Sequence, residues 1–191
     1  MLGKHDALIV VDVQNDFLPG GSLAVSDGDA VIPVINNCIK LSQAKSLPIY
    51  ATRDWHPADH CSFMENGGTW PEHCVAGSTG AQFSEDLALP NDVTIINKGT
   101  DKDKEAYSGF QDTDLSDQLH KKGIKRVIVG GLATDYCVLN TVYDALTNDL
   151  DVVLLTYAIR AVNVNPGDGE RAIESMIERG ADVYDGLILA N

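Results

Sequence analysis

The sequence predicts an α/β fold: one domain with three layers (αβα), in which helices cover both faces of a six-stranded, mostly parallel sheet. Apolar segments of strand length alternate along the chain with segments whose apolar residues recur at helical spacing, the order typical of parallel sheets. The strand-like segments are apolar at nearly every position, as strands covered on both faces are. Because 191 residues suffice to bury one such core, we expect residues 1–191 to form a single domain.

Six short apolar segments are the expected strands. They lie at residues 7–11, 47–52, 93–96, 126–129, 152–155 and 181–184. Right-handed crossovers would bring the carboxyl ends of the first four strands to one edge of the sheet, where open α/β sheets bind their ligands. Side chains able to carry out chemistry follow those ends: Asp12, Asp54, His56, Lys98 and Cys137.

Four further segments have the apolar spacing of helices. Asp29 can cap the first of them, and Cys38 lies on its apolar face, so we assign Cys38 to the core. The second and fourth helices end at Gly123 and Gly180, because glycine commonly follows the last turn of a helix. The third begins directly after the fourth strand. The chain from the second strand to about residue 90 shows little helical or strand periodicity, so we expect a long loop there. A loop of this length inside a compact domain is usually functional.

Composition excludes several classes of partner. A formal net charge of −14 argues against nucleic acid, whose phosphates this protein would repel. No apolar run is long enough to span a membrane and no secretion signal is visible, so we expect a cytoplasmic protein without a membrane partner. The four cysteines (Cys38, Cys61, Cys74, Cys137) are then expected as reduced thiols, and the lack of a CxxC pair argues against a zinc knuckle or a dithiol redox site.

Cys137 is the candidate nucleophile. It is expected just above the carboxyl end of a buried strand, in the first turn of a helix, after Gly130 and Gly131 have turned the chain. The unpaired N–H groups of that turn favour thiolate over thiol and could receive a negative substrate oxygen. Asp12 could accept the thiol proton, and Lys98 could hold the two anions together for attack on a carboxamide carbon. The alternatives are a buried core thiol, a turn-capping Asp12 and a solvated Lys98.

Asp54, His56, His60 and His73 form a second candidate group. An Asp-x-His sequence at the end of a strand puts both side chains on one face, because side chains alternate. One carboxylate and two imidazoles suit zinc, manganese or iron(II). Cys61 directly follows His60, and in an extended chain its thiol would point away from the imidazole. The alternative is a set of loop histidines that bind no metal.

Several motifs together resemble the nicotinamidases, within the isochorismatase-like cysteine hydrolases. They are VDVQNDF (11–17), PGGSL (19–23), RDWHP (53–57), HCSF (60–63), WPEHC (70–74), KG (98–99), AYSGF (106–110) and GLATDYCV (131–138). The resemblance covers about residues 8–142, and the pattern of strands and helices agrees to the end of the chain. The pair Asp-Trp-His-Pro and Trp-Pro-x-His-Cys separates nicotinamidases from their metal-free relatives.

The resemblance implies a role for each candidate residue. The catalytic triad would be Asp12, Lys98 and Cys137, and the metal ligands would be Asp54, His56 and His73, with His60 either a fourth ligand or a neighbour. It also implies a cis peptide before Ala133 and an oxyanion hole made by the N–H groups of Ala133 and Cys137. Phe17 and Trp70 would sandwich a pyridine ring, and Tyr107 would form a wall. The acidic segment 100–105 matches no fixed family pattern.

The expected function is therefore metal-dependent hydrolysis of nicotinamide to nicotinate and ammonia through a thioester, as in NAD salvage. The resemblance also implies turnover of pyrazinamide and one divalent metal ion, with zinc the first choice and iron or manganese as alternatives. A related cysteine amidase acting on another carboxamide or carbamoyl group remains the alternative. A non-catalytic metal- or ligand-binding module is the alternative from a different class. The sequence leaves open whether the chain forms a homo-oligomer.

Overall fold

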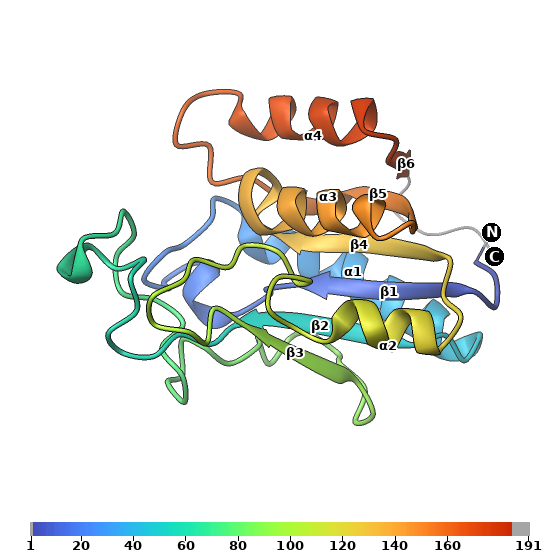
Figure 1. The fold of residues 1–191 in the computed structure, drawn as a ribbon, viewed down its shortest axis with the longest axis horizontal. Helices are drawn as coiled ribbons and strands as arrows, with labels where there is room; N and C mark the ends of the chain where they lie inside the picture. The colour runs from blue at the N-terminus through green and yellow to red at the C-terminus, as the bar shows by residue number, and fades with distance from the viewer. Residues whose placement is uncertain (1, 185–191) are drawn as a thin grey trace.

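A computed structural model describes residues 2–184 as a six-stranded sheet between two layers of helices (Figure 1). The strands are β1 (Asp6–Val11), β2 (Ile49–Asp54), β3 (Thr94–Lys98), β4 (Arg126–Leu132), β5 (Asp151–Arg160) and β6 (Asp182–Tyr184). Their order in the sheet is β3-β2-β1-β4-β5-β6, and every neighbouring pair is parallel. The α/β fold class is confirmed. That the full 1–191 chain forms one domain stays a prediction, because part of that range lies outside the described residues.

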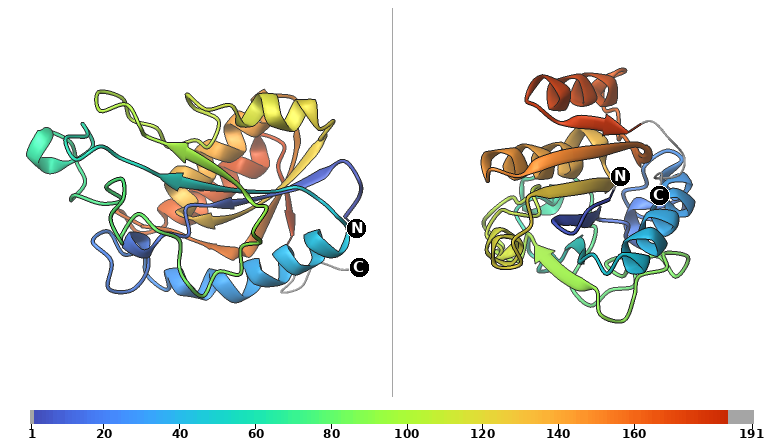
Figure 2. Two further views of the ribbon diagram at one scale, coloured as in Figure 1. Left: turned by 90° about the horizontal axis from the view of Figure 1, so that it is seen from below. Right: turned by 90° about the vertical axis from the view of Figure 1, so that its right-hand side faces the viewer.

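Four α-helices cover the sheet within residues 2–184. They are α1 (Ile32–Ala44), α2 (Leu115–Lys121), α3 (Leu139–Thr147) and α4 (Asp168–Glu178). Figure 2 shows α1 on one face and the other three on the opposite face. Because side chains alternate along a strand, Leu8 and Val10 of β1 pack on the α1 side, while Ile9 and Val11 join the core beneath α2, α3 and α4. β1 is thus buried on both faces.

The first helix begins later than the sequence suggested. A 3-10 turn at Gly28–Val31 precedes α1, and Asp29 lies inside that turn without capping the helix. Pro33 occupies the first turn of α1, where a missing N–H costs nothing. Cys38 is 1% exposed, so its assignment to the core is confirmed.

The fourth strand is longer than predicted. Gly130 and Gly131 continue β4 to Leu132 instead of turning the chain. Gly131 pairs with Val11 of β1 at a φ of +134°, and a Cβ there would overlap the Val11 backbone. Glycine therefore serves close packing of two central strands at this position. The peptide before Ala133 is cis, as the resemblance implies.

The segment between β2 and β3 projects beyond the carboxyl edge of the sheet (Figure 1). It is an organised loop, because isolated bridges join His56 to Val75 and Phe63 to Trp70. A third bridge, between Gln14 and Phe83, ties it to the chain that leaves β1. Across residues 2–184, none of the helices has the length and apolarity needed to cross a membrane.

Candidate active site

The structure brings Asp12, Lys98 and Cys137 together at the carboxyl edge of the sheet. Asp12 follows β1, Lys98 is the last residue of β3, and Cys137 lies in a π-helical turn (Thr134–Val138) between β4 and α3. The ammonium Nζ of Lys98 is 2.9 Å from Asp12 Oδ2 and 3.3 Å from Cys137 Sγ. All three are buried, so they interact in a low-dielectric environment.

The carboxylate of Asp12 has one occupied and one available oxygen. Oδ1 accepts a hydrogen bond from the Thr52 hydroxyl at 2.6 Å. Oδ2 is buried and, among residues 2–184, accepts no hydrogen bond of regular geometry, although the Lys98 ammonium lies beside it. The backbone turns sharply at Asp12, with a φ of +48°. A lone pair on Oδ2 therefore remains available for the proton of the Cys137 thiol.

Burial and neighbouring charges act on the thiol of Cys137 in opposite directions. Burial raises the pKa of Cys137 well above its ordinary value; Lys98 lowers it, but Asp12 and Asp54 raise it again. Apolar surroundings and two carboxylates oppose a negative charge on the sulfur, whereas the Lys98 ammonium favours it. Burial also raises the pKa of Asp12, against the lowering effect of Lys98. Thiolate formation thus requires transfer of the proton to a nearby base.

Lys98 joins the nucleophile to the second candidate group. Its ammonium donates a hydrogen bond to Asp54 Oδ1 as well as lying beside Asp12. Burial lowers the pKa of Lys98, but the carboxylates of Asp12 and Asp54 raise it by more. The pKa is therefore well above its ordinary value. Burial raises the pKa of Asp54, but Lys98 and His56 more than reverse this effect. The sequence did not reveal that Asp54 serves both groups.

Asp54, His56 and His73 present their ligand atoms to one point. These atoms all lie within 4.8 Å of one another, and His56 Nε2 is 3.6 Å from Asp54 Oδ2. Nδ1 of His56 donates to the Gly99 carbonyl at 2.9 Å, and Nδ1 of His73 donates to the Pro71 carbonyl at 2.7 Å. Because carbonyls only accept, each Nε2 carries a lone pair in the neutral ring. This donor set fits a divalent metal ion.

Gly99 makes room for His56. Its φ is +61°, and a Cβ at this position would overlap the His56 ring. The glycine after Lys98 therefore allows the backbone to approach the imidazole closely enough to accept its Nδ1 proton.

His60 lies beside the candidate ligands. Its ring stacks on that of His56 with 4.1 Å between centroids. Nε2 donates to the Lys104 carbonyl at 3.0 Å, and Nδ1 accepts the Ser62 N–H at 3.2 Å. Both ring nitrogens of His60 thus have protein partners. This arrangement favours His60 as a neighbour of the metal ligands over His60 as a fourth ligand.

A cavity of about 480 Å³, counted with its open mouth, joins the two groups. The residues lining it include the predicted Phe17, Trp70, Tyr107, Ala133 and Cys137. Trp70 Nε1 donates to the Tyr107 hydroxyl at 3.0 Å, so these two side chains hold each other in place. The aromatic and apolar walls suit a small aromatic molecule.

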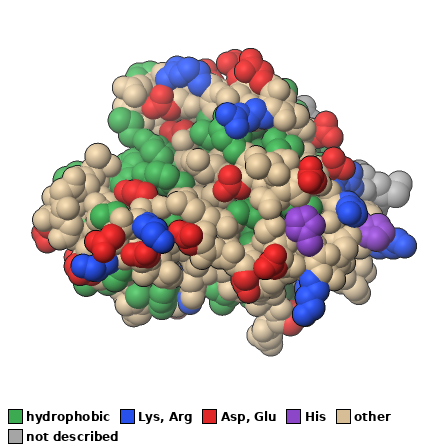
Figure 3. Space-filling view, in the orientation of Figure 1, with side chains coloured by type: hydrophobic (Ala, Val, Ile, Leu, Met, Phe, Trp, Pro, Cys, Tyr) green, Lys and Arg blue, Asp and Glu red, His purple; other side chains and the backbone are tan. Residues whose placement is uncertain are grey.

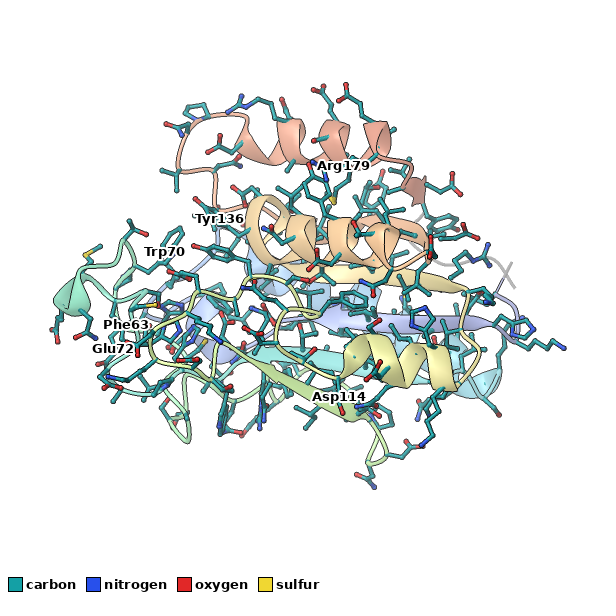
Figure 4. All side chains as sticks on the ribbon, viewed as in Figure 1. Phe63, Trp70, Glu72, Asp114, Tyr136 and Arg179 are labelled. Atoms are coloured by element: carbon teal, nitrogen blue, oxygen red, sulfur yellow. The ribbon has the colours of Figure 1, made fainter. Side chains whose placement is uncertain are left out.

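Tyr136 is a wall residue that the sequence reasoning missed. Its ring meets that of Trp70 edge to face with centroids 5.0 Å apart, and Figure 4 shows the two side by side. Figure 3 shows hydrophobic side chains gathered on the same part of this face. The sequence offered one indication of this role for Tyr136, which is its position immediately before the candidate nucleophile Cys137.

Both residues of the expected oxyanion hole lie at the cavity. Ala133 and Cys137 both line the cavity, and the peptide before Ala133 is cis. Backbone N–H groups beside a nucleophile can bind a negative oxygen.

Comparison with known proteins agrees with this geometry. The family model described as the isochorismatase domain matches residues 6–186. The nicotinamidase of Escherichia coli (strain K12) is 39% identical over 199 residues, covering 93% of each chain.

Two solved structures are also similar. The pyrazinamidase of Pyrococcus horikoshii, in complex with zinc, is 49% identical with a TM-score of 0.91, covering 95% of this chain and 99% of the other. PnC1 from L. infantum, in complex with nicotinate, is 36% identical with a TM-score of 0.88, covering 98% of this chain and 96% of the other.

Proposed function

The chain belongs to the isochorismatase family, and from this premise we propose that it hydrolyses nicotinamide to nicotinate and ammonia. The observation that carries the proposal is the contact of Lys98 with both Asp12 and Asp54, which puts a thiol nucleophile and a metal-binding group in one small cavity. A substrate with a carboxamide and a ring nitrogen uses both. The same site would accept pyrazinamide.

The reaction begins at Cys137. Asp12 Oδ2 takes the thiol proton as the sulfur attacks the carboxamide carbon, and Lys98 stabilises the negative charge that passes between them. The N–H groups of Ala133 and Cys137 bind the developing oxyanion, an interaction typically worth about 2.7–4 kcal/mol per donor. Protonated Asp12 then gives its proton to the departing ammonia, which leaves a thioester. Water attacks the thioester, releasing nicotinate and restoring the thiol.

Asp54, His56 and His73 would hold one divalent ion, with zinc the first choice and iron or manganese as alternatives. When bound, the ion supplies a Lewis acid for the ring nitrogen of the substrate. Phe17 and Trp70 would sandwich the ring, so that the carbonyl carbon lies over the sulfur.

The remaining expectations are also part of the proposal. The formal charge of −14 supports a small neutral substrate and argues against nucleic acid. We place the protein in the cytoplasm, without a membrane partner. The proposed mechanism uses residues of one chain, and a homo-oligomer stays a prediction.

Ammonia release tests the proposal. We expect turnover of nicotinamide, its loss after chelation, its return with zinc and slow turnover of benzamide, which lacks the ring nitrogen. Equal turnover of benzamide and nicotinamide would favour an amidase with a different substrate. Bound metal without ammonia release would favour a non-catalytic binding module.

A further inference from the structure

Gln14 is a buried polar residue that the proposed mechanism does not use. It lies in the segment that leaves β1 and is 0% exposed. Its Oε1 accepts the Asp54 N–H at 2.8 Å, and its Nε2 donates to the Asp54 carbonyl at 2.8 Å and to the Ala81 carbonyl at 2.9 Å. Only this orientation of the amide gives each carbonyl a donor and the N–H an acceptor.

These bonds continue the pairing of β1 with β2 beyond the end of β1. The last paired residues are Val11 and Thr52, and the Asp12 N–H still donates to the Thr52 carbonyl at 3.2 Å. The regular strand pairing ends here, because Asp12 has a φ of +48°. The carboxamide of Gln14 offers one donor and one acceptor, as a peptide does, and takes that place.

Asp54 is the residue for which this matters most. Its carboxylate bonds to Lys98 through Oδ1, and its Oδ2 lies 3.6 Å from His56 Nε2. Groups that hydrogen-bond to a metal-binding residue orient it toward the ion. We propose that Gln14 is a positioning residue, which fixes the Asp54 backbone so that the carboxylate meets the metal and Lys98 together. This inference rests on the proposed function, because it assumes a metal at Asp54, His56 and His73.

If Gln14 only stabilised the fold, its substitution would have a different effect. The bond from Gln14 to Ala81 tethers the loop between β2 and β3, and its loss alone would lower stability without changing metal binding in the folded protein. Asn15 provides the matched control, because its exposed Nδ2 donates to the Thr79 carbonyl of the same loop at 2.9 Å and makes no bond to Asp54.

The experiment compares Gln14→Met, which keeps the length but loses all three bonds, with Asn15→Ala. Zinc affinity is measured by competition with a chromophoric chelator, below the unfolding temperature of every variant. Nicotinamide hydrolysis is measured at saturating zinc. We expect Gln14→Met to weaken zinc binding by about 10–100-fold, the usual effect of losing a group that orients a metal ligand, and to lower kcat. Asn15→Ala should leave both unchanged.

Unchanged zinc affinity in folded Gln14→Met would overturn the inference. If that variant does not fold, Gln14→Glu is measured in the same way. It keeps the acceptor for the Asp54 N–H and loses the donor, so weaker zinc binding supports the inference and unchanged binding overturns it.

Leu119→Ala, a truncation in the core beneath α2, controls for lower stability. An equal loss of zinc affinity in this variant would also overturn the inference. A wild type that binds zinc but leaves nicotinamide intact would refute the proposed substrate, and the zinc data would still decide the role of Gln14.

Discussion

The groups proposed to react and the groups proposed to surround the substrate ring are held in different ways. Asp12, Lys98 and Cys137 lie at or just beyond the ends of β1, β3 and β4, so the register of a parallel sheet sets their distances. His73 and Trp70 lie in the loop between β2 and β3. There, each side chain makes one hydrogen bond, from His73 Nδ1 to the Pro71 carbonyl and from Trp70 Nε1 to the Tyr107 hydroxyl.

The difference predicts how each region responds to substitution. A sheet with buried strands keeps its register when one side chain changes, so changes among the strand-borne groups should affect the rate and leave metal and substrate binding intact. A loop side chain that loses its side-chain hydrogen bond can move, so changes in the loop should first affect the binding of metal and substrate. Asp54 belongs to both regions, because it ends β2 and bonds to Lys98.

The largest expected effect comes from the nucleophile, Cys137, in the turn that follows β4. Cys137→Ala removes the sulfur but keeps the backbone N–H, so kcat should fall by roughly 10⁴-fold or more while the zinc content stays at the wild-type level. Ammonia release and elemental analysis of the same sample measure the two quantities. Retained turnover would refute the nucleophile assignment, and loss of zinc would show that the two regions are not separable.

An intermediate effect is expected on the metal-binding side. Gly99→Ala places a Cβ against the His56 ring at a φ of +61°, so His56 must move, and zinc affinity should fall by about 10–100-fold. Chelator competition measures this. The matched control is Gly77→Ala, which has a similar φ of +83° and open space around the added atom. If both variants keep wild-type zinc affinity, the contact between Gly99 and His56 does not position a ligand.

The smallest effect is expected from a residue behind the proposed base. Thr52 donates to Asp12 Oδ1 and thereby stabilises the carboxylate, which lowers its pKa against the raising effect of burial. Thr52→Val removes that bond, so the pKa of Asp12 rises and the acid limb of kcat/KM moves to higher pH. A hydrogen bond to a charged group contributes about 1.5–3 kcal/mol, which corresponds to about one to two pH units.

Thr52→Ser keeps the hydroxyl and provides the control for this shift. Its pH profile should match that of the wild type, and the KM for nicotinamide should be unchanged in both variants. An acid limb that stays in place in Thr52→Val would show that Asp12 does not act as the base.

The sequence by itself determined the fold class, the positions of the strands and which residues gather at the carboxyl edge of the sheet. These features depend on local patterns: continuous apolar runs predict strands buried on both faces, and parallel connection fixes which ends meet. The burial of Cys38 followed from the same periodicity. The proximity of Asp12, Lys98 and Cys137 needed only this topology.

Only the tertiary structure decided which atoms are in contact and how the pKa values of the buried groups are shifted. The length of β4 depends on close packing of Gly131 against Val11, and the raised pKa of Cys137 depends on its burial beside two carboxylates. The bonds from Gln14 to Asp54 join residues 40 positions apart and follow from no local pattern. Hydrogen bonds and pKa values depend on distances of a few ångströms between remote segments, and periodicity along the chain does not encode those distances.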